Sequence, residues 1–399
     1  MKIKHYHENP PTAGLPIRWH DWLARNKDLS KCIEALFNLP PLSITCSGTI
    51  ALVVALKTLA KDNPNRKCVI IPAYTCPLVA LAINHCGLKI ILCDVAKNSF
   101  DFDFEKLALL LNDQVLAVIP THLGGRIANV AAVKKLTISY NITIIEDAAQ
   151  ALGAEVGKEG DIIIFSLATG KGLTMYEGGL LTANTPELRQ KIAETIRQIP
   201  RNIYWETKRI IELAGYTALY NPLGLYFAYG IAKRKALKKE NLIDAVGDYF
   251  DFNLPYHKVS KLRQNIASSS ACRLPDFIKA TTIQAKRRIE HLKKITNITV
   301  ITDGANDKGT WPFIMILLPS KTIRDTVLQQ LWPSNLGVSR LFIHALPNYT
   351  YLSQIVPQIS MPNAEDFAER MLTITNSLWL QDAEFNSICQ TLQANMIKC

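Results

Sequence analysis

One lysine in this sequence stands where a reactive amine would be useful. Residues 162–165 form an apolar run of strand length, Ser166 follows it, and Lys171 comes next among small residues. Gly178 and Gly179 then lead into a second apolar run, so Lys171 is predicted to lie at a strand end, where active sites collect. Lysine, unlike arginine, can lose its proton and form a Schiff base with an aldehyde. Taken alone, the segment is also compatible with an ordinary surface lysine in a loop.

A second candidate is a tight turn before a helix. Ser47, Gly48 and Thr49 precede residues 51–56, which are good helix formers without a breaker. Such a turn points free backbone N–H groups and the positive end of the helix dipole outward, which suits a phosphate group. A simple helix cap is the alternative.

A third candidate is Asp147, which follows the apolar run 142–145 and precedes small residues. A buried carboxylate without a partner would cost several kcal/mol, so a cationic or hydrogen-bonding group should meet it. A protonated pyridine nitrogen would serve. A helix N-cap is the alternative role.

These residues need a scaffold that brings strand ends together. Apolar runs rich in Ile and Val alternate with helix-compatible segments such as 78–85 and 129–140, which predicts a mostly parallel sheet covered on both faces. The loops after these strands hold the polar groups, including residues 121–125 and 146–150, and should carry the function. The strand-like runs are residues 68–71, 90–93, 115–119, 142–145 and 162–165.

Composition limits the class of protein. The chain has 399 residues, 48% of them hydrophobic, enough for a large core and two or three compact units. Its net charge of +11 is compatible with anionic partners, although a solvated basic surface is the favoured explanation. The nine cysteines form no CxxC pair, which indicates reduced thiols rather than a disulfide framework or a zinc site. The polar segment 1–14 lacks a signal-peptide core, so we expect a cytoplasmic protein.

Four motifs together resemble one family. The chain contains Ser47-Gly48-Thr49-Ile50-Ala51-Leu52, Pro72-Ala73-Tyr74-Thr75, Glu146-Asp147-Ala148-Ala149-Gln150-Ala151-Leu152-Gly153, and Phe165-Ser166 with Lys171 and Glu177-Gly178-Gly179. In this order they resemble the DegT/DnrJ/EryC1/StrS family of PLP-dependent sugar aminotransferases. The similarity covers most of residues 40–185 and returns in the tail. It implies a fold-type I PLP-dependent transferase: an α/β protein with a large, mostly parallel-sheet domain and a smaller α+β C-terminal domain.

The resemblance implies a role for each candidate residue. Lys171 would bind pyridoxal 5'-phosphate as a Schiff base and shuttle the proton, and Asp147 would keep the pyridine nitrogen protonated. Gln150 would donate to the ring oxygen. Gly48, Thr49 and Ser166 would bind the phosphate, and Tyr74 to Cys76 would lie over the ring face. A homodimer is implied as well.

The chain departs from the family pattern at several positions. Cys76 stands where the family stacks an aromatic residue, which leaves Tyr74 as the substitute. The segment between Gly153 and Asp161 is shorter than usual, and Tyr176 replaces a glycine before Glu-Gly-Gly. Ala271 stands at the expected asparagine that reaches across the dimer to the phosphate.

We divide the chain into residues 1–195, with the large PLP-binding domain, residues 196–266, a helical insertion, and residues 267–399, the small domain. Within residues 210–240 aromatic residues adjoin Lys233, Arg234, Lys235, Lys238 and Lys239. Two interpretations stay open: a packed helical subdomain, or a surface that touches the inner face of a membrane without spanning it. Arg340 and His344 are candidates for substrate contacts, without an assigned catalytic role.

The leading function is transfer of an amino group from an amino acid, in the first place glutamate, to a keto sugar carried on a nucleotide, for amino-sugar or polysaccharide biosynthesis, with no nucleic-acid partner. A dehydratase of the same family is disfavoured because that branch replaces the lysine, which is Lys171 here, by histidine. The alternatives are an aminotransferase acting on a non-sugar or lipid-linked ketone, and a scaffold or regulatory protein that has lost the cofactor.

Overall fold

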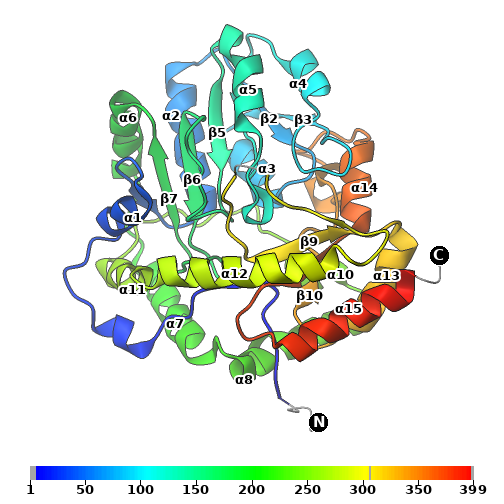
Figure 1. Cartoon of the computed structure of the whole chain (residues 1–399). Helices are drawn as coiled ribbons and strands as arrows, with labels where there is room; N and C mark the ends of the chain where they lie inside the picture. Colours follow the sequence, from blue (N-terminus) through cyan, green and yellow to red (C-terminus); the bar gives the residue numbers. More distant parts are fainter. Residues whose placement is uncertain (1–5, 305–306, 397–399) are drawn as a thin grey trace.

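The larger part of the molecule is built around a seven-stranded sheet (Figure 1). The computed structural model describes residues 6–304 and 307–396. The strand order is β1-β7-β6-β5-β4-β2-β3; strands β2 to β6 are parallel, whereas β7 and β1 run antiparallel to their neighbours. The strands are Ser43–Thr45 (β1), Cys68–Pro72 (β2), Lys89–Cys93 (β3), Val115–Val118 (β4), Thr143–Asp147 (β5), Ile162–Ser166 (β6) and Gly179–Ala183 (β7).

Helices cover both faces of this sheet, as strands that are apolar on both sides require. Every residue of β2, β4, β6 and β7 is buried. On one face lie α2 (Gly48–Asp62), α3 (Pro77–His85) and α6 (Pro186–Arg197), and on the other lie α4 (Phe104–Leu110) and α5 (Val130–Thr137). The predicted mostly parallel, doubly covered sheet is confirmed.

The C-terminal part builds a second, antiparallel sheet with the order β10-β11-β9-β8. Its strands and helices enclose a separate apolar cluster, which gives this part the expected α+β character. The elements are α12 (Leu274–Leu292), β8 (Thr299–Val300), β9 (Phe313–Leu317), α13 (Lys321–Leu331), β10 (Val338–Ser339), α14 (Pro362–Arg370), β11 (Met371–Thr375) and α15 (Asp382–Met396).

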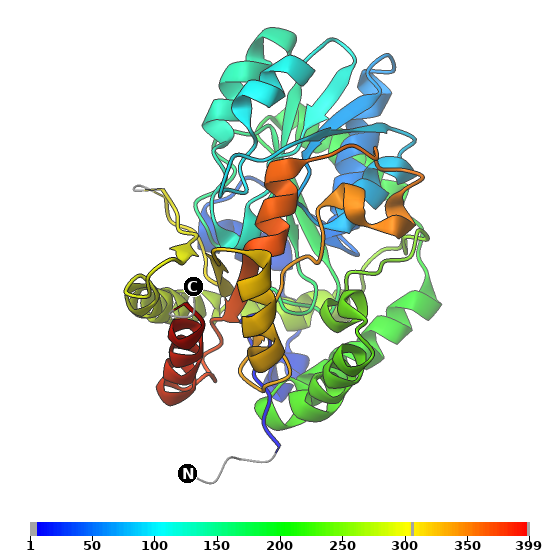
Figure 2. The ribbon, with the colours of Figure 1, turned by 90° about the vertical axis from the view of Figure 1, so that its right-hand side faces the viewer.

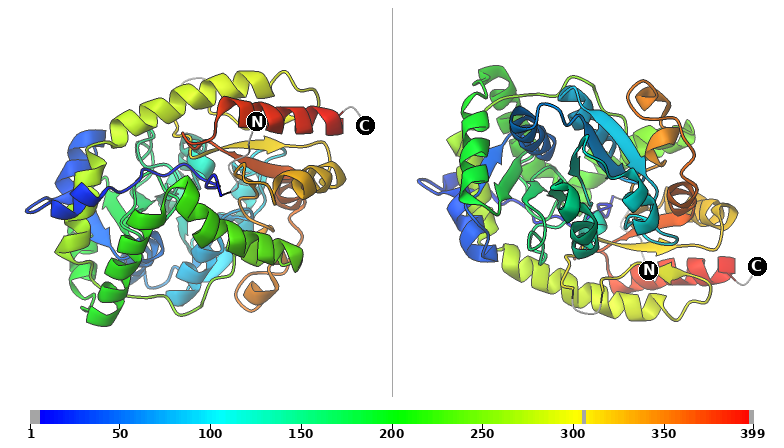
Figure 3. Two further views of the ribbon diagram at one scale, coloured as in Figure 1. Left: turned by 90° about the horizontal axis from the view of Figure 1, so that it is seen from below. Right: turned by 90° about the horizontal axis from the view of Figure 1, so that it is seen from above.

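The predicted insertion is helical, and its helices lie on the lower side of the molecule (Figures 2 and 3). Pro222 begins a new helix instead of interrupting a long one, because its fixed φ suits the first helical turn. None of the described helices is long and apolar enough to cross a membrane. The elements are α7 (Ile203–Leu219), α8 (Pro222–Leu225), a π-helical turn (Tyr226–Gly230), α9 (Ile231–Lys238) and α10 (Leu242–Val246).

The N-terminal residues pack against the start of the small domain. A 3-10 turn (Trp19–Leu23) and α1 (Leu29–Phe37) form this region, and α1 packs on α11 (Lys261–Ala271). The eight described cysteines are all free, and Cys399 lies outside the described residues.

Candidate active site

A cavity of about 400 Å³ lies at the carboxyl ends of the parallel strands, where α/β proteins bind ligands. Strands β2, β4, β5 and β6 each end at its wall, and the N-terminus of α2 closes one side. The expected cofactor-binding residues that line it are Gly48, Thr49, Cys76, Asp147, Gln150, Ser166 and Lys171.

Lys171 and Asp147 bring opposite charges to this cavity. Burial lowers the pKa of the Lys171 amine below its usual value, although the negative charge of Asp147 opposes the shift. Burial raises the pKa of Asp147, while the N–H of Ala149, 3.1 Å from Oδ1, and the charge of Lys171 lower it. No helix begins between β5 and β6 in the described chain, so Asp147 is not a helix N-cap. A protonated ring nitrogen fits the demand of this buried carboxylate for a cation.

The N-terminus of α2 is built for an anion. Ser47 caps the helix, because its Oγ accepts the N–H of Ile50 at 3.1 Å. Gly48 and Thr49 are the first helical residues, whose N–H groups have no partner within the helix. A Cβ at Gly48 would come within 2.9 Å of the Ser166 Cβ, so only glycine lets the helix end approach the serine this closely. The free N–H groups at the start of α2 and the Ser166 hydroxyl together fit a phosphate group.

The side-chain amide of Gln150 is held in one orientation in the same cavity. Its Oε1 accepts a hydrogen bond from the backbone N–H of Gly124 at 2.7 Å. Because this bond fixes the amide, its nitrogen remains as the donor for a ligand oxygen.

His122 lines the cavity too, although the sequence did not single it out as a site residue. Its Nδ1 accepts the N–H of Ala128 at 3.1 Å, so the ring proton is on Nε2, which donates to Glu146 Oε2 at 3.0 Å. Glu146 also accepts the N–H groups of Gly157 and Gly160, at 2.7 and 2.6 Å. These bonds fix the imidazole and close the short loop between β5 and β6. A feature of the sequence that could have identified His122 as a cavity residue is its position just after the apolar run that forms β4.

Tyr74 and Cys76, expected together over the ring, have different surroundings. Cys76 lines the cavity, and burial raises the pKa of its thiol to about 12. Tyr74 points into the core: its ring lies 5.6 Å from that of Phe342 and 5.1 Å from that of Phe367, and its hydroxyl donates to the Phe342 carbonyl at 3.2 Å. The residues that line the cavity do not include Tyr74. The structure therefore does not bring Tyr74 to the site.

The insertion contributes a wall that the sequence did not predict. The cavity is lined from this side by Val246, Gly247 and Phe250. Asp248 anchors the segment, because its Oδ2 accepts the Tyr349 hydroxyl at 2.6 Å and the Ile343 N–H at 2.7 Å. Burial raises the pKa of Asp248 to about 6. Insertion and small domain therefore meet at the edge of the cavity.

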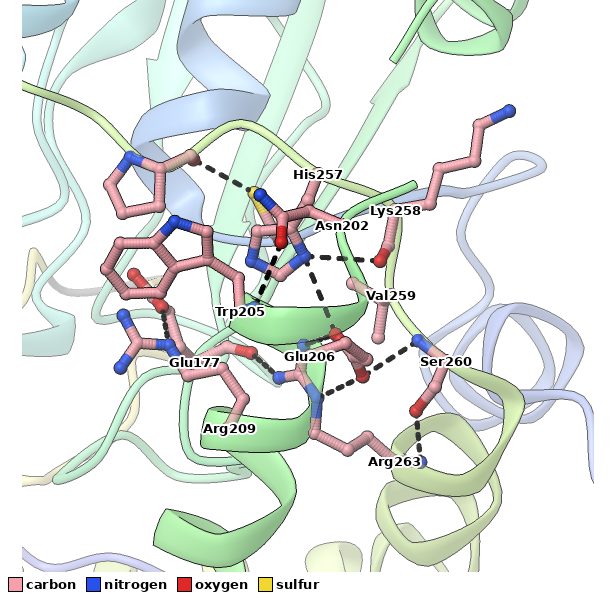
Figure 4. A network of polar contacts seen from close by, with 12 residues as sticks. Glu177, Asn202, Trp205, Glu206, Arg209, His257, Lys258, Val259, Ser260 and Arg263 are labelled. Atoms are coloured by element: carbon pink, nitrogen blue, oxygen red, sulfur yellow. Dashed lines mark hydrogen bonds and ion pairs between the residues drawn. The ribbon is translucent and has the colours of Figure 1, made fainter. Parts of the chain in front are cut away.

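A buried ion-pair network braces the loop that carries Lys171 (Figure 4). Arg263 donates to both carboxylate oxygens of Glu206, on α7, at 2.7 Å each. The same guanidinium donates to the backbone carbonyls of Met175 and Glu177. Burial acts to raise the pKa of Glu206, but the hydrogen bonds and charge of Arg263 hold it below its usual value. The insertion and α11 thus hold the segment that follows Lys171.

Tyr176 in this loop has a φ of +69°, a left-handed conformation that favours glycine. This explains why a glycine is the usual residue in the pattern that the chain resembles. The tyrosine ring packs against an apolar cluster that includes Ile17, Leu213 and Ile266. Its packing retains the tyrosine in an unfavourable backbone conformation.

Three further candidates lie away from the cavity. Ala271 is fully buried in the cluster that joins α1 and α11, so its side chain is not placed to reach a second subunit. Arg340 is buried and donates to the carbonyls of Ile343 and Ala368. His344 packs against the ring of Tyr349 at 5.3 Å.

Two relatives with named functions match this sequence over different lengths. UDP-4-amino-4,6-dideoxy-N-acetyl-beta-L-altrosamine transaminase of Campylobacter jejuni is 26% identical over 386 residues, which cover 91% of this chain and 89% of that protein. GDP-perosamine synthase of Caulobacter vibrioides is 32% identical over 171 residues, 41% of this chain and 46% of that protein. This second match spans about half the length of the relative.

The fold is shared with solved aminotransferases. Helicobacter pylori PseC, an aminotransferase involved in the biosynthesis of pseudoaminic acid, superposes with a TM-score of 0.73 at 15% identity, over 98% of this chain and all of that one. The likeness confirms the expected fold-type I α/β architecture. The sequence model of the DegT/DnrJ/EryC1/StrS aminotransferase family matches residues 41–393. The chain therefore belongs to the DegT/DnrJ/EryC1/StrS aminotransferase family.

Proposed function

We propose that this protein is a pyridoxal-phosphate-dependent aminotransferase that moves an amino group from an amino acid, in the first place glutamate, to a keto sugar carried on a nucleotide. The product would enter amino-sugar or polysaccharide biosynthesis. The observation that carries the proposal is the convergence of Lys171, Asp147 and the N-terminus of α2 on one cavity. The nucleotide-sugar transaminases among the relatives support the choice of acceptor.

Pyridoxal phosphate, when bound, supplies the electron sink that amino transfer requires. Lys171 holds and moves the proton at its Nζ, because burial lowers its pKa and makes the neutral amine accessible. Asp147 keeps a proton on the ring nitrogen, and Gln150 donates to the ring oxygen. Gly48, Thr49 and Ser166 hold the phosphate.

We further propose a homodimer in the cytoplasm, with an amino-acid donor, a sugar acceptor and no nucleic-acid partner, and with contact to the inner face of a membrane through the insertion. Family membership supports the dimer, and the exposed basic and apolar residues of α7 to α9 support the contact.

The test separates the two halves of the reaction. The purified protein is incubated with pyridoxal phosphate, and its visible absorbance band is recorded before and after addition of glutamate. A band that glutamate bleaches, with release of 2-oxoglutarate, is expected. A nucleotide-linked keto sugar should then restore the band and gain an amino group.

Each alternative predicts a different result. A protein that has lost the cofactor shows no protein-bound band once free pyridoxal phosphate has been removed by gel filtration. An enzyme for a non-sugar or lipid-linked ketone completes the glutamate half but leaves the nucleotide-linked keto sugar unchanged. Either result would overturn the proposal in its stated form.

A further inference from the structure

The helices α7, α8 and α9 present a long outer face on which no fully exposed residue is acidic, and the partly exposed Glu212 of α7 pairs with Arg209. Between residues 201 and 239 no exposed residue is Asp or Glu, and Glu240 is the first exposed acid that follows. The exposed basic residues on this stretch are Arg201, Lys208, Lys235, Lys238 and Lys239. Large apolar side chains are exposed between them, namely Ile203, Tyr204, Ile211, Leu219, Leu223, Phe227 and Ile231. Isolated exposed apolar residues are common, but a row of this length is not.

The second half of this face has a regular spacing. Leu223, Phe227 and Ile231 follow one another at steps of four, and Lys235 continues the series. Steps of four lie on one side of a helix, and all four residues are exposed. Phe227 remains 53% exposed and Ile211, on α7, 66%. Tyr6, itself 58% exposed, stacks on the Phe227 ring at 5.7 Å between centroids and adds to the same patch. These side chains therefore form an outward row that stays largely exposed.

Fewer basic residues lie on this outer face than the sequence predicted. Lys233 and Arg234 belong to the opposite side, where they pair with the buried Glu8 at 2.5 and 2.6 Å. Only Lys235, Lys238 and Lys239 of the five expected basic residues are exposed. The packed-subdomain interpretation thus holds for the inner side, and the outer side keeps both apolar and basic residues.

We propose that the outer face of α7 to α9 docks the enzyme on an anionic phospholipid surface, with the helices lying in the plane of the headgroups. Apolar and aromatic side chains suit the boundary between headgroups and acyl chains, and lysines suit the anionic headgroups around them. Helix α7 and the segment from α8 to α9 lie together on the lower side of the molecule (Figure 3, left; Figure 2). They can therefore meet one surface at the same time.

The charges decide against a second copy of this chain as the occupant. A symmetric dimer places the same patch on both sides of the interface, so the five exposed cations would face their own copies without an exposed acid among them. An anionic surface removes this conflict. This inference rests on the membrane contact proposed above and specifies its lipid chemistry. Its failure is distinguishable from a failure of the transaminase proposal, because lipid binding does not require a working transamination site.

The experiment is vesicle flotation with the full-length protein at low salt. Vesicles of phosphatidylcholine alone are compared with vesicles that also contain phosphatidylserine. The test variant is Lys235→Gln/Lys238→Gln/Lys239→Gln. The matched control is Lys89→Gln/Lys97→Gln/Lys135→Gln, which removes three exposed lysines of the large domain and gives the same net charge. A third variant, Leu223→Ser/Phe227→Ser, removes two apolar contacts.

We expect flotation on the phosphatidylserine vesicles only. Each lysine near an anionic surface contributes about fivefold, so the test variant should lose about a hundredfold in partition coefficient. The control variant should bind like the wild type, and the third variant should bind more weakly. Absence of flotation, or an equal loss in test and control variants, would overturn the proposal. So would a change of oligomeric state in Leu223→Ser/Phe227→Ser on size exclusion, since it would assign the face to a second copy.

Discussion

The cavity stabilises its two charged residues poorly on its own. Burial lowers the pKa of Lys171 below 10.5, so the unfolded chain binds this proton more readily than the folded chain does. Between the folded and the unfolded pKa, stability therefore rises with pH, and below that window the buried ammonium lowers stability. Binding of the amine to a cofactor would remove this cost.

Lys171→Ala should abolish transamination and the visible band while the fold stays intact. Without cofactor at neutral pH the variant should be at least as stable as the wild type, because a disfavoured buried ammonium is lost. As pH rises toward 10, the unfolding free energy of the wild type should increase relative to that of the variant. Thermal unfolding at several pH values measures it, with the exposed Lys89→Ala as control. Turnover by Lys171→Ala with pyridoxal phosphate and glutamate would falsify the role of Lys171.

Asp147→Asn should slow turnover by about 10²–10³-fold, the usual effect of removing one preorganised charged group at a reacting centre. The side chain keeps its shape, so cofactor affinity should fall only modestly. Because burial raises the pKa of Asp147, its ionised form is disfavoured in the fold, and the neutral amide should not destabilise the protein. Steady-state rates and a cofactor titration by absorbance measure these effects. A rate close to that of the wild type would remove Asp147 from the mechanism.

The placement of single residues in the cavity could be predicted where strand position decides it, and their roles stay a prediction. Lys171 and Asp147 reach the cavity because Asp147 ends strand β5 and Lys171 follows strand β6 of the same sheet, and an apolar run reveals each strand. Tyr74 follows a strand as well, but its ring contacts Phe342 and Phe367, which come from a distant part of the chain. No local pattern shows whether a side chain after a strand turns to the cavity or to the core.

At the scale of elements, Arg263 and Glu206 join α11 and α7 to the loop after Lys171. Arg263→Met should destabilise the protein by about 3–5 kcal/mol, because it leaves the Glu206 carboxylate largely buried without its cation. The carbonyls of Met175 and Glu177 lose their donor too, so the visible absorbance of the lysine-bound cofactor should weaken. The double variant Glu206→Gln/Arg263→Met should recover much of the stability. Urea unfolding compares the three proteins, and additive losses would contradict the pairing.

The same pair predicts an acid dependence. The folded pKa of Glu206 lies below its usual value of 4.5, so its contribution to stability is present above pH 4.5 and is lost as pH falls through the folded pKa. Glu206→Gln should lose stability at neutral pH and show a smaller further decrease below pH 4.5 than the wild type. Unfolding free energies at pH 7 and pH 4 measure this difference. An identical acid slope in both proteins would show that another carboxylate is responsible.

Most elements could be predicted from apolar runs, whereas the role of the insertion could not. Periodicity indicates that residues 203–246 are helical, but Val246 and Phe250 reach the cavity only because Asp248 binds Tyr349 and Ile343. Such a contact depends on two segments about a hundred residues apart. The boundaries at residues 195 and 266 stay a prediction.

At the scale of the whole molecule, the N-terminal segment connects all three parts. Glu8 binds Lys233 and Arg234 of α9, and the N–H of Leu15 donates to the Gly172 carbonyl, next to Lys171, at 3.0 Å. The N–H of Asn9 donates to the carbonyl of Asn335 in the small domain, also at 3.0 Å. The active-site loop, the insertion and the small domain should therefore respond together to a change in this segment.

Glu8→Gln tests this connection. Lys233 is 2% exposed, and burial already lowers its pKa although the charge of Glu8 opposes the shift. Without that carboxylate the buried ammonium has no counter-charge, so the loss should be about 3–5 kcal/mol at neutral pH. It should shrink as pH rises and Lys233 loses its proton. Glu8→Gln/Lys233→Met should recover the stability, and Glu159→Gln, which breaks an exposed pair with Lys134, should cost no more than about 1 kcal/mol.

Hydrogen exchange locates the effect of Glu8→Gln. Amides of residues 8–15 and of α8 to α9 should exchange faster, with a smaller change after Lys171, while β2 to β6 stay protected because their core does not contact Glu8. Uniformly faster exchange over the whole sheet would show that Glu8 supports global stability only. Unchanged exchange in α9 would show that Lys233 and Arg234 hold the insertion without the N-terminal segment, and the proposed connection between the three parts would fail.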